Sequence, residues 1–304
     1  MSDLTQLLDT EFFQIGLRFG VLALIVGWAL VLILRTRVRI LHIGGILIAA
    51  GVSATLVALD EGFIREIFGL ALIAAGAGLA RALKAPEWVI PLAAVPGAAW
   101  IAFTTNATNF LWVRIALLVL IPVCGYLITD FENRYRKMGL GMIFYALAAL
   151  GVFVAVPDTE WARVLIAVAV PVVFLAWPHV RVSLGVEGAY VATAVLILVS
   201  GQGGEPRPAS IVGSIACLGL LVLEPIAFAM SPSIVAITTA MRQNWAGAVL
   251  ASVPQFVVVA LCSRVAAAFT SELPAFITVV VVYMATLAIG FWADPARTAT
   301  GERS

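Results

Sequence analysis

Residues 16–34 read GLRFGVLALIVGWALVLIL, and Arg18 is the one charged side chain among them. A helix needs roughly 20 apolar residues to cross the hydrocarbon core of a bilayer. The rest of the chain has the same character, because 62% of its 304 residues are hydrophobic and 12% are charged. Soluble domains are usually about half apolar and about one quarter charged. The composition therefore excludes a soluble enzyme, a disordered chain and a DNA-binding protein, and it predicts a polytopic membrane protein.

Ten further apolar stretches follow, and none shows the alternating pattern of a membrane β-barrel. The eleven predicted spans are 16–34, 40–59, 63–83, 88–105, 111–129, 139–156, 161–178, 182–200, 209–230, 246–267 and 274–292. Backbone groups in lipid must be hydrogen-bonded within their own segment, so each span is expected to be a helix. The predicted fold is a single all-α membrane domain over 1–304, and 231–245 leaves room for an additional half-helix.

Basic residues in short loops indicate orientation, because they stay on the cytoplasmic side of the membrane. With the N-terminus outside, twelve Lys and Arg residues fall on the inner side and six on the outer side. The first 16 residues contain no basic side chain, so we expect no cleavable signal. Arginine outnumbers lysine by 16 to 2, as is typical of GC-rich bacterial genomes. We therefore expect a bacterial cytoplasmic membrane, with the N-terminus outside and the C-terminus cytoplasmic.

An aromatic-x-Arg tripeptide recurs at a fixed spacing of 49 residues. The three copies are Phe63-Ile-Arg65, Trp112-Val-Arg114 and Trp161-Ala-Arg163. Each copy opens a span that enters from the outer side, so residues 16–208 are predicted to be tandem helical hairpins of about 49 residues. The pattern fades in 209–292, which we assign to divergent C-terminal helices, and a polar tail follows at 293–304.

Two roles are open for Arg65, Arg114 and Arg163. In the first, the aromatic residues lie at the level of the lipid headgroups and the arginines reach to phosphate, as in an ordinary interfacial belt. In the second, the arginines form an outward-facing ring that binds an anionic headgroup or a lipid-linked phosphate.

Glu224 is the acid that orientation explains least. It lies within the apolar stretch LLVLEPI at 220–226, and Pro225 follows it. A carboxylate at that depth needs a partner, a proton or a watery cavity, and a proline in a helix leaves one backbone carbonyl without its donor. The pattern predicts an ion or substrate site at Glu224, with Glu187 as a second acid. The alternatives are a helix-end acid at 224 and a cytoplasmic loop residue at 187.

The remaining polar residues have more ordinary interpretations. Asp130 and Glu132 precede several basic residues, and the run is interpreted as a solvated inner loop that orients the protein. His42 and His179 are the only histidines, and no metal-binding spacing occurs, so neither a metal site nor a cofactor is expected. The chain also has no P-loop, and hence no ATPase of its own.

These features favour a permease-like or lipid-handling protein, with membrane lipids as partners and Glu224 and Glu187 at an inner polar site. The alternative is a non-catalytic scaffold subunit of an envelope-biosynthesis or secretion complex, whose partners would be other membrane subunits. A membrane-embedded transferase acting on a lipid-linked substrate ranks third, because no clustered acid and base is visible. A formal net charge of +1 gives no reason to expect a nucleic-acid partner.

Overall fold

Eleven α-helices make up most of the described part of the chain. This computed structural model describes residues 10–34, 40–59, 62–104, 111–135, 139–156, 160–176, 181–201, 212–213, 215–230, 245–268 and 272–292. The helices are α2 (Glu11–Leu34), α3 (Gly44–Ala58), α4 (Ile64–Ala82), α5 (Val89–Thr104), α6 (Leu111–Tyr135), α7 (Leu140–Ala155), α8 (Glu160–Val173), α9 (Val186–Gly201), α11 (Leu220–Met230), α13 (Trp245–Ala268) and α14 (Glu272–Trp292). Every predicted span overlaps one of them, so the all-α prediction is confirmed for the described residues.

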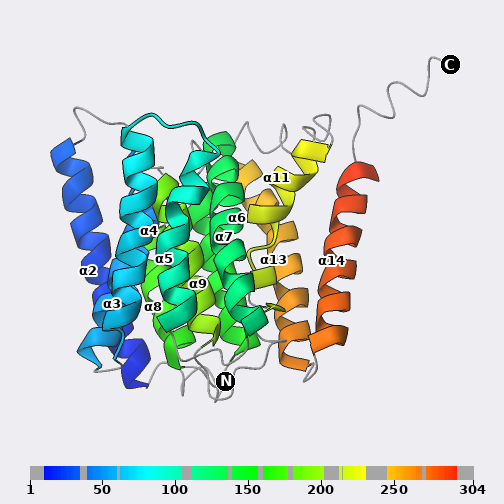
Figure 1. The fold of residues 1–304 in the computed structure, drawn as a ribbon, viewed down its shortest axis with the longest axis horizontal. Coiled ribbons are helices and arrows are strands. Elements are labelled where there is room, and N and C mark those ends of the chain that lie inside the picture. Colours follow the sequence, from blue (N-terminus) through cyan, green and yellow to red (C-terminus); the bar gives the residue numbers. More distant parts are fainter. Residues whose placement is uncertain are drawn as a thin grey trace.

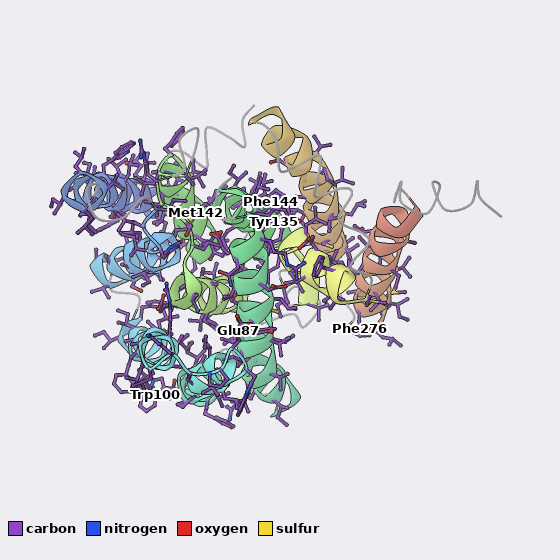
Figure 2. All side chains as sticks on the ribbon, turned by 90° about the horizontal axis from the view of Figure 1, so that it is seen from above. Glu87, Trp100, Tyr135, Met142, Phe144 and Phe276 are labelled. Carbon is purple, nitrogen blue, oxygen red and sulfur yellow. The ribbon has the colours of Figure 1, made fainter. Side chains whose placement is uncertain are left out.

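The helices stand side by side, with α2 at one edge of the bundle and α14 at the opposite edge (Figure 1). Helix α2 packs along α8 and α3, α4 pairs with α5, and α13 packs on α7. Seen from above, Tyr135, Met142 and Phe144 lie near the centre, whereas Trp100 and Phe276 lie toward the periphery (Figure 2). The core therefore runs through α6 and α7 and their neighbours α8 and α9, and the peripheral helices shield it.

The predicted spans differ from the observed helices at the end of α6 and before α11. Helix α6 continues to Tyr135, six residues beyond the predicted end at 129, because Asp130 and Arg134 pair one turn apart along it. The predicted span 209–230 is not one continuous helix, since tight turns at 217–219 precede α11. Gly219 has a positive φ of 51°, which favours glycine.

The outer surface of the bundle is apolar. Helix α2 alone exposes Leu17, Val21, Leu22, Ile25, Val26, Trp28, Leu32 and Ile33. By length and composition, α2 is the one helix within the described ranges that is long and apolar enough to cross a membrane. Its most apolar 18-residue stretch has a mean hydropathy of 2.5, and 22% of that stretch is buried. Seven further apolar helical stretches have 10–17 residues.

Several predicted features lie outside the described residues. These are the region 231–244, the tail 293–304, His179 and the side chain of Trp112. Helices α4, α6 and α8 each begin within a few residues of one aromatic-x-Arg copy, as the hairpin scheme requires. The duplication itself stays a prediction.

Candidate functional site

Two short extended segments, residues 40–43 and 181–185, run in parallel just before α3 and α9. They are joined by Leu41 N–H to the Arg181 carbonyl oxygen at 2.8 Å, Ser183 N–H to the Leu41 oxygen at 2.9 Å, Gly44 N–H to the Ser183 oxygen at 2.8 Å and Gly45 N–H to the Leu184 oxygen at 3.1 Å. The predicted spans began at 40 and 182, and the structure instead starts both helices four residues later. The first turns of α3 and α9 are therefore held next to each other.

Glycines permit this close approach. A Cβ on Gly45 would lie 2.2 Å from the carbonyl oxygen of Gly188, which is a backbone atom that has no room to move away. Gly185 has a φ of +80°, and a Cβ there would lie 2.2 Å from the carbonyl oxygen of His42. Both positions therefore require glycine, one for space and one also for backbone conformation.

Glu132 reaches the same junction from α6. It is 4% exposed, and its Oε1 accepts a hydrogen bond of 2.6 Å from the backbone N–H of Leu184. Helix α7 leaves space for the carboxylate at Gly141, where a Cβ would lie 2.7 Å from the carboxyl carbon. The interpretation of Glu132 as part of a solvated loop is wrong, because the helix continues past it and neighbouring elements bury it.

A small cavity opens beside Glu132, and we call it the polar pocket. It is lined by His42, Arg81, Thr129, Glu132, Asn133, Ser183, Gly185 and Val186. His42 Nδ1 and Ser183 Oγ are joined by a hydrogen bond of 2.7 Å, so the imidazole is fixed to the segment that precedes α9. The cavity volume of about 20 Å³ is enough for one water molecule.

Glu187 follows the pocket-lining residue Val186, in the first turn of α9. Arg81, in the last turn of α4, donates from Nη1 to both carboxylate oxygens of Glu187, at 3.1 and 3.2 Å. The Glu187 side chain is 17% exposed and the Arg81 side chain 44%. Glu187 is therefore a helical residue that links two elements around the polar pocket, rather than a loop residue.

Glu224 belongs to a second cluster, between α11 and the end of α6. The Tyr135 hydroxyl donates to its Oε1 at 2.6 Å, and Arg134 Nη1 lies 3.6 Å from the same oxygen. Arg134 also pairs with Asp130 and lies over the ring of Phe228, 3.7 Å from its centroid. The carboxylate thus has the partners that an acid in an apolar span needs.

The structure places Glu187 and Glu224 in two clusters rather than in one site. Glu187 is bonded to α4, and Glu224 is bonded to α6. The last two turns of α6 connect the clusters, because Glu132 lines the polar pocket and Tyr135 holds Glu224.

The break before α11 is bridged by Gln255 of α13, which is fully buried. Its Oε1 accepts from Leu220 N–H at 2.7 Å, and its Nε2 donates to the Leu218 carbonyl oxygen at 3.2 Å. The hydroxyl of Tyr283 donates to the Ala216 carbonyl oxygen at 2.7 Å on the other side of the break. The Ala216 and Leu218 carbonyl oxygens also accept from Gly219 N–H and Leu221 N–H, each at 3.0 Å. The side chains of α13 and α14 therefore supplement the backbone hydrogen bonds of the turns, and Gln255 supplies the acceptor for Leu220 N–H.

Two of the three aromatic residues of the repeated tripeptide, Phe63 and Trp161, are core residues. Phe63 and Trp161 are 1% and 8% exposed, and their rings pack edge to face with centroids 5.1 Å apart. The interfacial-belt interpretation is wrong for this pair, because the two rings face each other inside the bundle. Arg65 is exposed on α4, and Arg114 and Arg163 are half-buried on α6 and α8. Their binding of anionic headgroups stays a prediction.

Sequence reasoning missed three parts of the polar centre, namely Glu132, Gln255 and the pairing of 40–43 with 181–185. The available signals were weak. Gly44-Gly45 and Gly185-x-x-Gly188 each stand beside a helix start, but glycines of this kind are also ordinary packing residues in membrane helices. Gln255 gave a clearer signal, as a lone amide within an apolar run.

The described side chains contain no group of three or more His, Cys, Asp or Glu residues that could hold a metal ion. Comparisons of the chain with protein-family models, with curated proteins and with solved structures find no match.

Proposed function

We propose that the chain is an integral membrane protein whose helices cross the bilayer. The support is the apolar surface, which continues from α2 around the bundle. Examples from the other helices are Phe68 and Leu79 on α4, Leu92 and Phe103 on α5, Ile115 and Val119 on α6, Phe256 and Leu261 on α13, and Phe276, Val280 and Met284 on α14. A continuous apolar surface of this extent is unfavourable in water and favourable in lipid.

Polar side chains lie in the interior of the bundle and at one of its ends, away from the apolar surface. Gln255, Glu132 and Thr193 are buried, so the interior holds polar groups while the surface holds large apolar side chains. Arg81, Arg134 and Arg181 lie at one end of the bundle, because all three belong to the elements around the polar pocket and the end of α6. This placement supports the cytoplasmic assignment of that end of the bundle, in a bacterial membrane, with the N-terminus outside.

Within this membrane protein we assign a permease-like function to the polar pocket and the Glu224 cluster. The observation that carries the assignment is the set of buried Glu132 and Ser183 with half-buried His42, between helices of an otherwise apolar bundle. Buried polar groups in membrane helices are costly and are retained mainly where ions or polar solutes pass. Glu187 and Glu224 are the candidate substrate- or ion-binding acids, one in each cluster.

A scaffold subunit is the second candidate, and one observation favours it. The polar pocket has room for a single water molecule, which is too little for a metabolite. Under the scaffold hypothesis, the apolar face of α14 would bind another membrane subunit, and changes at Glu187 or Glu224 would leave complex formation intact.

Uptake by proteoliposomes tests the permease function. The full chain is reconstituted and assayed with labelled amino acids, sugars and inorganic ions. We expect Glu187→Gln and Glu224→Gln each to lower uptake roughly tenfold or more, because a charge-assisted hydrogen bond worth about 1.5–3 kcal/mol is lost. Glu87→Gln serves as the matched control, because this acid is exposed on the connection between α4 and α5. Unchanged uptake by a well-expressed Glu224→Gln protein would remove Glu224 from the mechanism.

A further inference from the structure

The size of the polar pocket restricts what it binds. With about 20 Å³, it accepts a water molecule or a hydronium ion, but no organic solute. The lining side chains offer a carboxylate at Glu132, an imidazole at His42 and a hydroxyl at Ser183. These are the groups that accept, hold and pass on protons.

The site around Glu132 is shaped for one carboxyl group. Gly141 of α7 leaves the space that a Cβ would fill, and the backbone N–H of Leu184 fixes Oε1. His42 is fixed in turn by its hydrogen bond to Ser183, the residue that precedes Leu184. The carboxylate and the imidazole are therefore both anchored to the segment before α9, and both line the same cavity.

The charged side chains on the elements around Glu132 are paired with other groups or exposed, so a proton can be added to Glu132 without breaking an ion pair. Arg81 of α4 is paired with Glu187 of α9, and Arg134 of α6 interacts with Asp130 and Glu224. Arg181 and Glu87 are exposed, and α5 and α7 have no charged residue along their length. Protonation of Glu132 therefore changes the charge of the pocket by one unit and leaves the Arg81–Glu187 pair intact.

We propose that the polar pocket is a proton-binding site in which the Glu132 carboxylate takes a proton from a hydronium ion in the cavity. One O–H bond of the hydronium breaks, one O–H bond forms on Glu132, and a water molecule remains. His42 is a positioning residue that, when protonated, favours the charged form of Glu132. This inference rests on the proposed permease function, for which it supplies the coupling ion.

Carbodiimide labelling tests the proposal directly. Dicyclohexylcarbodiimide reacts with a protonated carboxyl group in an apolar environment, where the carboxyl adds across a C=N bond and rearranges to a stable N-acylurea. The full chain is labelled in lipid nanodiscs at a series of values from about pH 8 down to about pH 5, on either side of the ordinary histidine range. Mass spectrometry of the peptides then reports the labelled fraction at Glu132.

The expected result is labelling of Glu132 that increases as the pH falls, by about tenfold per unit on the alkaline side of the midpoint. Where His42 is protonated, His42→Ala is expected to move this midpoint to higher pH, because a cation among the lining side chains favours the carboxylate. Exposed Glu87 is the control and should stay unlabelled. Absence of labelling at Glu132 throughout the series, or labelling that does not vary with pH, would overturn the proposal. No transported solute is needed, so pH-dependent labelling without any uptake would contradict the permease function alone.

Discussion

Replacing Gly76 with alanine is expected to lower the free energy of unfolding by about 1–3 kcal/mol. Gly76 lies on the face of α4 that packs against α5, and a Cβ there would lie 2.1 Å from the carbonyl oxygen of Ala93. The obstructing atom belongs to the backbone of a helix, so the clash is relieved only by moving α5 away from α4. The contact between α4 and α5 is the most extensive among the described helices. Separating them therefore weakens side-chain packing along both helices.

Gly78→Ala is the matched control, two residues further along the same helix. A Cβ at Gly78 would lie 3.4 Å from the Cγ atom of Glu187, which is an ordinary contact distance. Because alanine is the better helix former, this variant is expected to be neutral or more stable by up to about 1 kcal/mol. Thermal unfolding of the purified proteins in detergent measures the difference. Equal midpoints for the two variants would show that α4 and α5 do not approach as closely as described.

The second large effect is expected for Gln255→Leu. Leucine preserves the approximate volume but leaves Leu220 N–H without its buried acceptor, whereas the Leu218 carbonyl oxygen keeps its hydrogen bond of 3.0 Å from Leu221 N–H. An unsatisfied buried polar group costs about 1–3 kcal/mol, which is the loss expected for Leu220 N–H, and the lost hydrogen bond to the Leu218 carbonyl oxygen adds about 1 kcal/mol. The variant also releases the start of α11, and with it the helix that carries Glu224. Its unfolding midpoint should fall well below that of the wild-type protein.

Tyr283→Phe calibrates this prediction at the same break. It removes the hydrogen bond to the Ala216 carbonyl oxygen, which also accepts from Gly219 N–H at 3.0 Å. The expected loss is about 1 kcal/mol, because the carbonyl keeps one partner. A Gln255→Leu protein that is no less stable than Tyr283→Phe would contradict the bridging role of the amide.

The helices themselves could be predicted from the sequence, because each apolar stretch is long and is bounded by charges or by glycine and proline. The predicted span at 246–267 and the observed helix Trp245–Ala268 differ by one residue at each end. The errors occurred where a tertiary contact overrides the local pattern. Glu132 and Tyr135 are polar enough to suggest a loop, yet α7, α9 and α11 cover them and the helix continues.

The polar centre could not be predicted in the same way. The hydrogen bond between Leu184 and Glu132 joins residues 52 positions apart, and that between His42 and Ser183 spans 141. Such contacts depend on which helices pack against each other. The hydrophobic pattern along one helix does not determine its neighbours. The recurring aromatic-x-Arg pattern illustrates the same limit. Its spacing was visible, but the packing of Phe63 on Trp161 depends on the positions of their helices in space.

The central claim is that the apolar outer surface of the bundle faces lipid, and site-directed spin labelling tests it most directly. Cys124, Cys217 and Cys262 are first replaced, and one nitroxide at a time is then placed at Val26, Val119, Val280 or Lys84 in the liposome-reconstituted chain. We predict that molecular oxygen, rather than a water-soluble nickel complex, relaxes the labels at the three valines, and that the order is reversed at exposed Lys84. Strong relaxation by the nickel complex at the valines would show that water covers this surface, and would contradict the account.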